Sequence, residues 1–405
     1  MKTDLVWQPA TSVERYRAID IIRGLALFGV LIVNILSGFR VPLLEHIQQP
    51  YADSGRIGHL VELLVAGVLE FKAITIFSFL FGVGIAIQHE RAASHKCSIM
   101  SFLARRLAWL FVLGVFHLFV IWNGDILALY AVCGLLLLPL LGMTWTQLLV
   151  IGAGLIVLPE FVSFGLRLPS GPAAAAGIAE ARQVYGNEGF LSILRFRWHE
   201  SWSLIVPLLL SVLLRTTGLM CWGMAAWRGG ILSKPNAHRA KLGSALAIGA
   251  SMGGAITVNG IWAKSSGIAP WPALLNSHVD ASILLALAYV AGLLLWLTPR
   301  RASLWRGFAA IGQTALTNYL LQSIILGFVF YGYGLGLFGR IGSAAAAAIG
   351  LALYTAQVQL SRLWLRRFRF GPFEWLWRSL AYGRQQPMLR GGELSCGMQG
   401  EDGRI

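Results

Sequence analysis

Three arginine-flanked apolar stretches of this 405-residue sequence each contain one polar residue at a similar distance from the arginine. The intervals are eleven residues from Arg23 to Asn34, eleven from Arg106 to His117 and twelve from Arg306 to Asn318. At a helical rise of about 1.5 Å per residue, each polar group lies roughly 16–18 Å above a basic anchor. This is near the middle of a hydrocarbon layer about 30 Å thick, where polar groups usually face a bundle interior. The spacing therefore predicts a polar site inside a membrane protein.

The composition supports a membrane environment. Hydrophobic residues make up 56% of the chain and charged residues only 13%, with a mean hydropathy of +0.66, whereas soluble domains average about 25% charged residues. We expect an all-α, polytopic transmembrane bundle of about ten spans, with a short extra helix at 58–67 outside it. The expected spans are 23–40, 68–88, 107–123, 126–142, 146–165, 202–226, 242–263, 279–298, 309–332 and 341–361.

The distribution of Lys and Arg predicts the orientation of these spans. If the N-terminus is cytoplasmic, 23 of the 33 basic residues fall on the cytoplasmic side, eight fall outside and two fall within spans. Positive residues favour the cytoplasmic side, so both termini are expected to be cytoplasmic. Contact with anionic headgroups of the lipid bilayer accounts for the net charge of +15. No nucleic-acid partner is therefore needed to explain it.

The chain divides into four parts at this level. Residues 1–22 form a cytoplasmic segment, and 23–230 form an N-terminal transmembrane half with an external loop at 166–201. Residues 231–385 form a C-terminal half that ends in an interfacial aromatic and basic helix, and 386–405 form a polar, Gly-rich disordered tail. The four cysteines include no CxxC pair, so we expect neither a disulfide nor a metal site.

The strongest candidate for acid–base chemistry is His117. No other ionisable residue lies between Arg106 and Asp125, and a neutral imidazole can act as a general base. A histidine that only packs helices together is the alternative interpretation. Asp125 follows a Trp-Asn-Gly turn, where it could cap the next helix or orient His117. Capping is the simpler interpretation.

Arginines at the cytoplasmic ends of the first three spans are candidates for binding an anionic donor. Arg23 lies three residues after Asp20, and Arg91, Arg105 and Arg106 flank the next cytoplasmic loop. The planar guanidinium group suits phosphate oxygens. The same residues could serve only as positive-inside anchors, with an ion pair between Asp20 and Arg23.

Two further features are polar groups within apolar stretches. Arg215 lies deep in Leu204–Trp227, where an isolated charge costs about 2.5–3.5 kcal/mol or more, so it needs a partner or a wet cavity. Asn318 and Gln322 are four residues apart and share one helix face. They could line a substrate cavity, or they could hydrogen-bond neighbouring helices together.

Several stretches together resemble one family of proteins. Those that carry the resemblance are Ala18–Asn34, Phe77–Gly84, Ala315–Ser323, Phe330–Gly339 and Phe370–Arg378. The chain resembles the YeiB-like family of bacterial inner-membrane proteins, described as domain of unknown function 418. The resemblance implies a multi-pass protein of the bacterial inner membrane.

The first span is more distantly similar to transmembrane acyltransferases. Arg23 and Asn34 resemble the opening helix of the lysosomal heparan-α-glucosaminide N-acetyltransferase, whose active site contains that Asn. In the acyltransferase-3 group a His takes the place of Asn34. The heparan enzyme has its catalytic His eleven residues after the Asn, where this chain has Glu45, followed by His46. The resemblance leaves open whether His46 or His117 serves as the base, or whether the chemistry is absent.

The leading interpretation is an integral membrane acyltransferase that uses acyl-CoA as a cytoplasmic co-substrate and holds no covalently bound cofactor. The acceptor would be a hydroxyl or amine of a small molecule or glycan that enters from the opposite side. His117 would be the general base and Asn34 would stabilise the thioester oxygen. Arg215, Asn318 and Gln322 would line the acceptor route.

Two other function classes remain open on the sequence alone. The first is a transporter of a small polar or anionic solute, with Arg215 as the counter-ion. No inverted repeat of broken helices accompanies it, which disfavours this class. The second is a non-catalytic membrane protein that acts through a partner. A homodimer is an arrangement that the sequence neither requires nor excludes.

Overall fold

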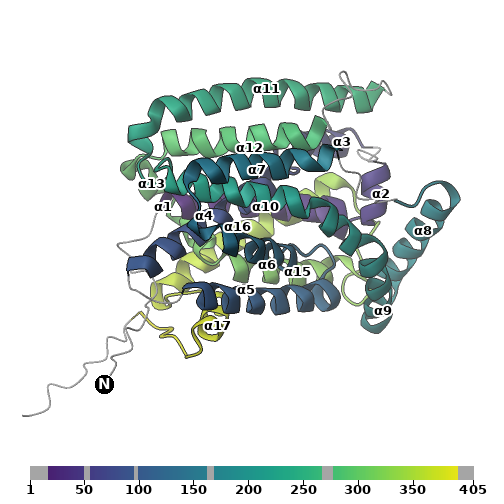
Figure 1. The fold of residues 1–405 in the computed structure, drawn as a ribbon. Coiled ribbons are helices and arrows are strands. Elements are labelled where there is room, and N and C mark those ends of the chain that lie inside the picture. Colours follow the sequence, from purple (N-terminus) through teal and green to yellow (C-terminus); the bar gives the residue numbers. More distant parts are fainter. Residues whose placement is uncertain (1–16, 50–54, 95–98, 162–167, 267–276, 391–405) are drawn as a thin grey trace, which may run out of the picture.

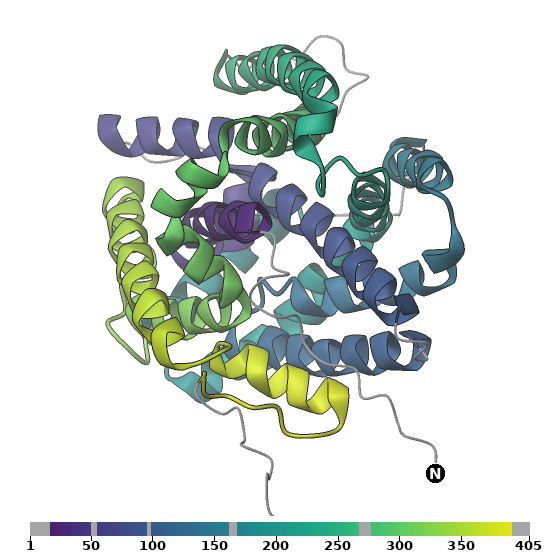
Figure 2. The same cartoon turned by 90° about the vertical axis from the view of Figure 1, so that its left-hand side faces the viewer.

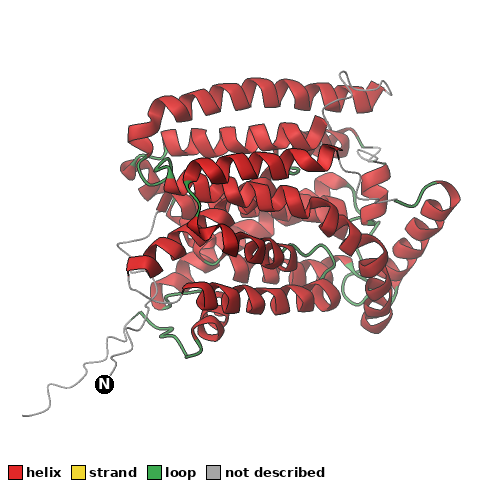
Figure 3. Cartoon of the chain, in the orientation of Figure 1, coloured by secondary structure: helices red, strands yellow, loops and turns green. Residues whose placement is uncertain are grey.

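The computed structural model describes residues 17–49, 55–94, 99–161, 168–266 and 277–390. Within these ranges the regular structure is helical, apart from one isolated bridge between Phe368 and Leu389. Figures 1 and 3 show the helices side by side, most of them with their axes in one common direction. The predicted all-α class is confirmed.

Apolar helices make up most of the bundle. Six helical stretches of the described chain are long and apolar enough to cross a membrane, and four shorter helices are also apolar. The protein is therefore a multi-pass membrane protein. Its main helices are α1 (Arg17–Asn34), α3 (Arg56–Val68), α4 (Lys72–Ser94), α5 (Ile99–Phe116), α6 (Leu127–Leu137), α7 (Trp145–Phe161), α10 (Val206–Arg228), α11 (Arg239–Ser266), α12 (Ser277–Trp296), α14 (Arg306–Gln313), α15 (Ala315–Phe330) and α16 (Ser343–Arg367).

Polar contacts define two ends of the bundle. At one end, which we call the basic end, Arg228 closes α10 and donates to the backbone oxygens of Leu141 and Met143. Trp227 donates to Glu90 near the end of α4, at 2.7 Å. At the opposite end, Arg40 lies 2.7 Å from Glu62 of α3. Figure 1 shows the basic end on the left, and Figure 2 views the molecule from that side.

Glycines allow the central helices to cross closely. A Cβ atom at Gly82 of α4 would lie 2.0 Å from the backbone oxygen of Met220 in α10, and one at Gly223 would lie 1.9 Å from that of Phe79. Gly312 of α14 is equally tight against the backbone of Asp20 in α1. In membranes, such small residues let backbones approach and gain dispersion contacts. These crossings pack α4 against α10 and α1 against α14.

The predicted external loop 166–201 is largely helical. It forms α8 (Gly171–Asn187) and α9 (Phe190–Glu200), and α9 continues through the π-helical turn η5 (Ser201–Ile205) into α10. Alanines in α8 favour a helix, and a proline at its first turn suits helix initiation. Residues 162–167 lie outside the described residues.

The predicted C-terminal aromatic and basic segment is divided between two helices: Arg362–Arg367 belong to the end of α16, and the rest forms the helix α17 (Pro372–Tyr382). Instead of lying only at the membrane surface, α17 packs across the basic end. Trp377 donates to the backbone oxygen of Arg106 at 2.8 Å. Residues 386–390 of the expected tail are described, and Arg369 donates its N–H to the oxygen of Met388 at 2.8 Å. Residues 391–405 lie outside the described residues.

Candidate functional site

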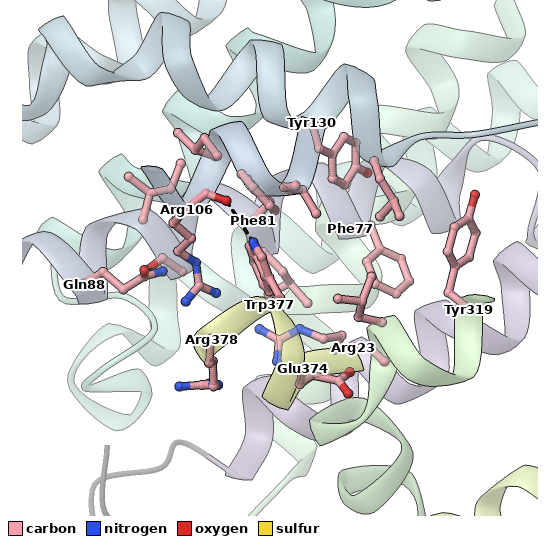
Figure 4. Close-up of a pocket in the computed structure, with 18 of the residues that line it drawn as sticks. Arg23, Phe77, Phe81, Gln88, Arg106, Tyr130, Tyr319, Glu374, Trp377 and Arg378 are labelled. Carbon is pink, nitrogen blue, oxygen red and sulfur yellow. Dashed lines mark hydrogen bonds between the residues drawn. The ribbon is translucent and has the colours of Figure 1, made fainter. Parts of the chain in front are cut away.

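A pocket of about 330 Å³ opens at the basic end among α1, α4, α5, α6, α14, α15 and α17. We call it the central pocket. Figure 4 shows arginines toward one end of it and two tyrosines toward the other. Apolar side chains, among them Phe77, Phe81 and Leu107, line the middle. The pocket is therefore amphipathic, with a cationic mouth and a largely apolar inner part.

Four arginines line the mouth, namely Arg23, Arg91, Arg106 and Arg378. The first three belong to the set that the sequence singled out for an anionic donor. The guanidinium of Arg106 lies over the ring of Trp377, 3.8 Å from its centroid, which fixes the side chain by a cation–π contact. Arg23 is also 3.1 Å from Asp20, so the predicted ion pair is present as well.

Arg105, the fourth predicted donor residue, does not line the central pocket. It is exposed and donates to the backbone oxygen of Ala381, so it attaches α17 to α5. A second attachment is Glu374 of α17, which accepts hydrogen bonds from the backbone N–H and the hydroxyl of Thr317, at 3.1 and 2.5 Å. Burial raises the pKa of the Glu374 carboxyl, although these hydrogen bonds oppose that shift.

His117 and Asp125 are paired in the interior. Nδ1 of His117 lies 2.9 Å from Oδ1 of Asp125, and both side chains are fully buried. The second carboxylate oxygen accepts the N–H of Ala128 at 2.8 Å, near the start of α6. Asp125 thus caps the helix and orients the histidine, which the sequence treated as alternatives.

The hydrogen-bond pattern gives His117 a definite chemical character. A carboxylate only accepts hydrogen bonds, so Nδ1 of the neutral imidazole carries the hydrogen and Nε2 presents its lone pair. Nε2 is buried and has no hydrogen-bond partner among the described residues. His117 also begins the π-helical turn η3 (His117–Ile121), a geometry that is frequent at functional sites. The arrangement is that of an oriented imidazole base.

One aromatic ring separates this pair from the central pocket. Tyr319 of α15 lines the inner end of the pocket, and its ring centroid is 5.1 Å from that of His117. The Tyr319 hydroxyl donates to the backbone oxygen of Gly124 at 3.2 Å. Sequence reasoning passed over Tyr319 because an isolated aromatic residue in an apolar helix carries no distinctive signal.

Asn34 is the last residue of α1 and is followed by the π-helical turn η2 (Ile35–Phe39). The spacing Arg23, Leu27, Val30, Asn34 follows one helix face, and the first three of these residues line the central pocket. Asn34 itself does not line the pocket, although it lies on the same side of α1, one turn beyond Val30. It is partly buried and makes no side-chain hydrogen bond to a described residue.

The structure does not bring the remaining candidates to this site. Nδ2 of Asn318 donates to Ser361 at 3.0 Å and Nε2 of Gln322 donates to Gln357 at 2.8 Å, both across to α16. These contacts match the alternative in which the polar stripe joins two helices. Arg215 is partly buried in α10 and does not line the central pocket.

On the far side of His117, toward the opposite end, lies a polar cluster that the sequence did not reveal. Arg197 of α9 is fully buried and donates to the oxygen of Val120 in η3 at 2.6 Å. Glu200 accepts from Tyr185 and from Asn123, each at 2.6 Å. The sequence analysis expected an external loop at 166–201 and named neither Arg197 nor Glu200 as a candidate site residue.

His46, the other candidate base, lies in a different place. Its Nε2 is 3.3 Å from Oε1 of Glu70, and it lines a small pocket of about 100 Å³ at the opposite end. Glu45 of the same pocket is paired with Arg182 of α8. This pocket shares no lining residue with the central pocket.

The comparisons with known proteins decide the family. The sequence profile described as "Protein of unknown function (DUF418)" matches residues 226–384. The chain is 31% identical to the uncharacterized protein YxaH of Bacillus subtilis, over 95% of this chain and 98% of that protein. The chain belongs to this family. It is also 28% identical to the uncharacterized protein YeiB of Escherichia coli, over 93% and 98% of the two chains, which confirms the resemblance seen in the sequence.

The family assignment extends over the whole site. The profile region contains α15 and α17, which supply Tyr319, Glu374 and Arg378. His117 and Asp125 lie before it, in the part that is covered by the near full-length similarity to the bacterial relatives.

Proposed function

We propose that this protein is an integral membrane acyltransferase that takes its acyl group from cytoplasmic acyl-CoA. The observation that carries the proposal is the His117–Asp125 pair, in which Nε2 of His117 has no hydrogen-bond partner among the described residues. Only the ring of Tyr319 lies between this pair and a pocket whose mouth is lined by arginines. Base and donor pocket are then adjacent. Fold alone does not fix a function, so the proposal rests on this site.

The central pocket has the chemistry that an acyl-CoA donor requires. Arginines at the mouth suit the phosphates of the nucleotide, since guanidinium pairs with phosphate through parallel hydrogen bonds. The apolar middle suits the acyl-pantetheine arm. The thioester would then lie toward Tyr130 and Tyr319 at the inner end, on the side of the His117–Asp125 pair.

In the proposed reaction, the acceptor hydroxyl or amine attacks the thioester carbonyl while Nε2 of His117 removes its proton. The new acyl–oxygen or acyl–nitrogen bond forms as the carbon–sulfur bond breaks, and the CoA thiolate takes the proton from the imidazolium. Asn34 would donate to the developing oxyanion. Because the Tyr319 ring stands between pocket and base, it has to turn aside during the reaction.

The acceptor would approach from the opposite end. The cluster of Asn123, Tyr185, Glu200 and Arg197 lies on that side of His117 and offers buried donors and acceptors. A glycan or small polar molecule is recognised by groups of this kind.

The proposed topology has ten spans in the bacterial inner membrane, with both termini cytoplasmic. The six long and four shorter apolar helices support this number, and the gathering of arginines at the basic end supports the direction. Reporter fusions after Arg384 should act as cytoplasmic, and fusions within 172–190 should act as external. A cytoplasmic 172–190 region would overturn the orientation and place the donor pocket on the wrong side.

The decisive experiment measures acyl-CoA binding and turnover with the purified protein. Isothermal titration calorimetry should detect acetyl-CoA or a longer acyl-CoA, and a thiol reagent should detect CoA release that depends on an added acceptor. His117→Ala should abolish release and keep acyl-CoA affinity within about twofold, because a general base acts on the transition state. Solute flux in vesicles with no acyl-CoA binding would instead support a transporter.

A further inference from the structure

A second pocket at the basic end is lined by five arginines. It has a volume of about 410 Å³, and the lining includes Arg17 of α1, Arg306 of α14, Arg362 and Arg366 of α16, and Arg390, which follows α17. We call it the arginine pocket. No Asp or Glu lines it among the described residues. The established family and the proposed reaction assign it no role.

The fold brings these arginines together from distant parts of the sequence. Arg362 and Arg366 are four residues apart and share one face of α16. Arg306 begins α14, and the close approach of Gly307 to Val358 and Arg362 of α16 fixes its position. Convergence of this kind does not follow from the general placement of basic residues on the cytoplasmic side.

Backbone hydrogen bonds hold the last arginine in place. Arg390 donates its N–H to the oxygen of Arg367 at 3.0 Å, and its Nε donates to the oxygen of Phe368 at 3.2 Å. The segment after α17 thus folds back to add a fifth positive charge to the end of α16.

The electrostatics of the arginine pocket favour an anion. None of its five arginines has a carboxylate within 4 Å in the described part of the chain. Arg362 donates only to the neutral side chain of Gln359, at 3.3 Å. Like charges on one surface repel one another, and a bound phosphate relieves that repulsion while it accepts several hydrogen bonds.

We propose that the arginine pocket binds the phosphate of an anionic phospholipid from the inner leaflet. Two exposed leucines neighbour its arginines in the chain: Leu363, next to Arg362 on α16, is 54% exposed, and Leu304, two residues before Arg306, is 81% exposed. These leucines suit acyl chains, and the arginines suit the headgroup at the edge of the hydrocarbon.

The same phosphate chemistry has a second source, the nucleotide of a CoA donor. The arginine pocket and the central pocket are both lined by Gln313, so the two lie next to each other. The exposed leucines favour the lipid, because a nucleotide has no apolar chain to cover them. The experiment therefore separates lipid from nucleotide.

The test compares two charge-matched variants of the full-length protein. Arg306→Gln/Arg362→Gln/Arg366→Gln removes three charges from the arginine pocket. The control, Lys234→Gln/Arg239→Gln/Lys241→Gln, removes three exposed charges from the segment that follows Arg228 at the same end and that does not line the pocket. Native mass spectrometry from nanodiscs of phosphatidylcholine with 20% phosphatidylglycerol would measure retained phosphatidylglycerol. Isothermal titration would measure binding of 3′,5′-adenosine diphosphate.

We expect the pocket variant to lose at least tenfold in phosphatidylglycerol retention and to keep nucleotide affinity, with the control unchanged. Equal retention by wild type and pocket variant would overturn the proposal. Loss of nucleotide affinity with unchanged lipid retention would also overturn it, because the arginine pocket would then bind the nucleotide of the acyl-CoA donor. Retention of phosphatidylglycerol by the wild-type protein should also fall as the salt concentration rises, and this measurement needs no variant. Retention that does not change with salt would refute the proposal. Neither the lipid retention nor its salt dependence requires acyl transfer. A failure of the proposed acyltransferase function would appear in the CoA-release assay and not in these lipid measurements.

Discussion

Asp125→Asn is the sharpest perturbation of the proposed reaction, because it changes one atom in a buried pair. The asparagine oxygen can still accept the N–H of Ala128, which Asp125 accepts at 2.8 Å. Its amide nitrogen then faces Nδ1 of His117, where a carboxylate oxygen stood at 2.9 Å. Two donors cannot bond, so the imidazole is driven to the tautomer with hydrogen on Nε2. In that form Nε2 has no lone pair with which to accept a proton.

The size of the effect follows from the lost contact. A hydrogen bond to a charged group contributes about 1.5–3 kcal/mol, and 1.4 kcal/mol corresponds to a factor of ten. We therefore expect kcat to fall by about 10-fold to 150-fold. Acyl-CoA affinity should stay within about twofold of wild type, because Asp125 and His117 do not line the central pocket.

The assay is acceptor-dependent CoA release, with acyl-CoA binding measured on the same preparations. His199→Gln is a suitable control, since His199 is exposed at the opposite end and its side chain makes no described hydrogen bond. A folded Asp125→Asn protein with wild-type turnover would refute the assignment of His117 as the base. An equal loss of acyl-CoA affinity and turnover would show that the pair acts on the pocket rather than on proton transfer.

Three further perturbations test the surroundings of the site. Arg106→Gln/Arg378→Gln should weaken acyl-CoA binding by more than tenfold in calorimetry, since each charge-assisted contact contributes about 1.5–3 kcal/mol. Unchanged binding would mean that these arginines only anchor their helices at the cytoplasmic surface. Gln322→Leu should lower thermal stability by about 1–3 kcal/mol because it leaves a buried α16 partner unsatisfied, with turnover per folded molecule unchanged. For Glu374, whose pKa burial raises, the native state holds the proton more tightly than the unfolded state. Its contribution to stability should fall as pH rises from about 4.5 through the raised pKa, and Glu374→Gln should remove that pH dependence from thermal unfolding.

The sequence was informative wherever chemistry is local. Apolar runs gave the helices of the bundle, because a membrane helix has to satisfy its backbone internally. The pairing of His117 with Asp125 could be considered from the sequence because only eight residues and one turn separate the two. The mouth arginines of α1, α4 and α5 were found because each flanks an apolar stretch of the sequence on the same side of the bundle.

What the sequence could not supply was the direction of side chains around each helix axis. Asn318 and Tyr319 are consecutive, yet Asn318 bonds α16 while Tyr319 faces His117. Successive helix residues point about 100° apart, so equal depth says nothing about whether two groups meet. Only the packing of α15 between two neighbours decides which of the two residues reaches the site.

The proposed site is assembled from both halves of the chain. Arg378 and Tyr319 come from the C-terminal region that defines the family, whereas His117 and Arg106 come from α5 and η3. The contact of Trp377 with Arg106 joins the two regions across the pocket mouth. A substitution that loosens α17, such as Trp377→Ala, should therefore open the donor mouth without touching the His117–Asp125 pair. In the proposed reaction, donor capture and proton transfer would then be two separate tasks, and acyl-CoA binding and CoA release measured on this variant would distinguish them.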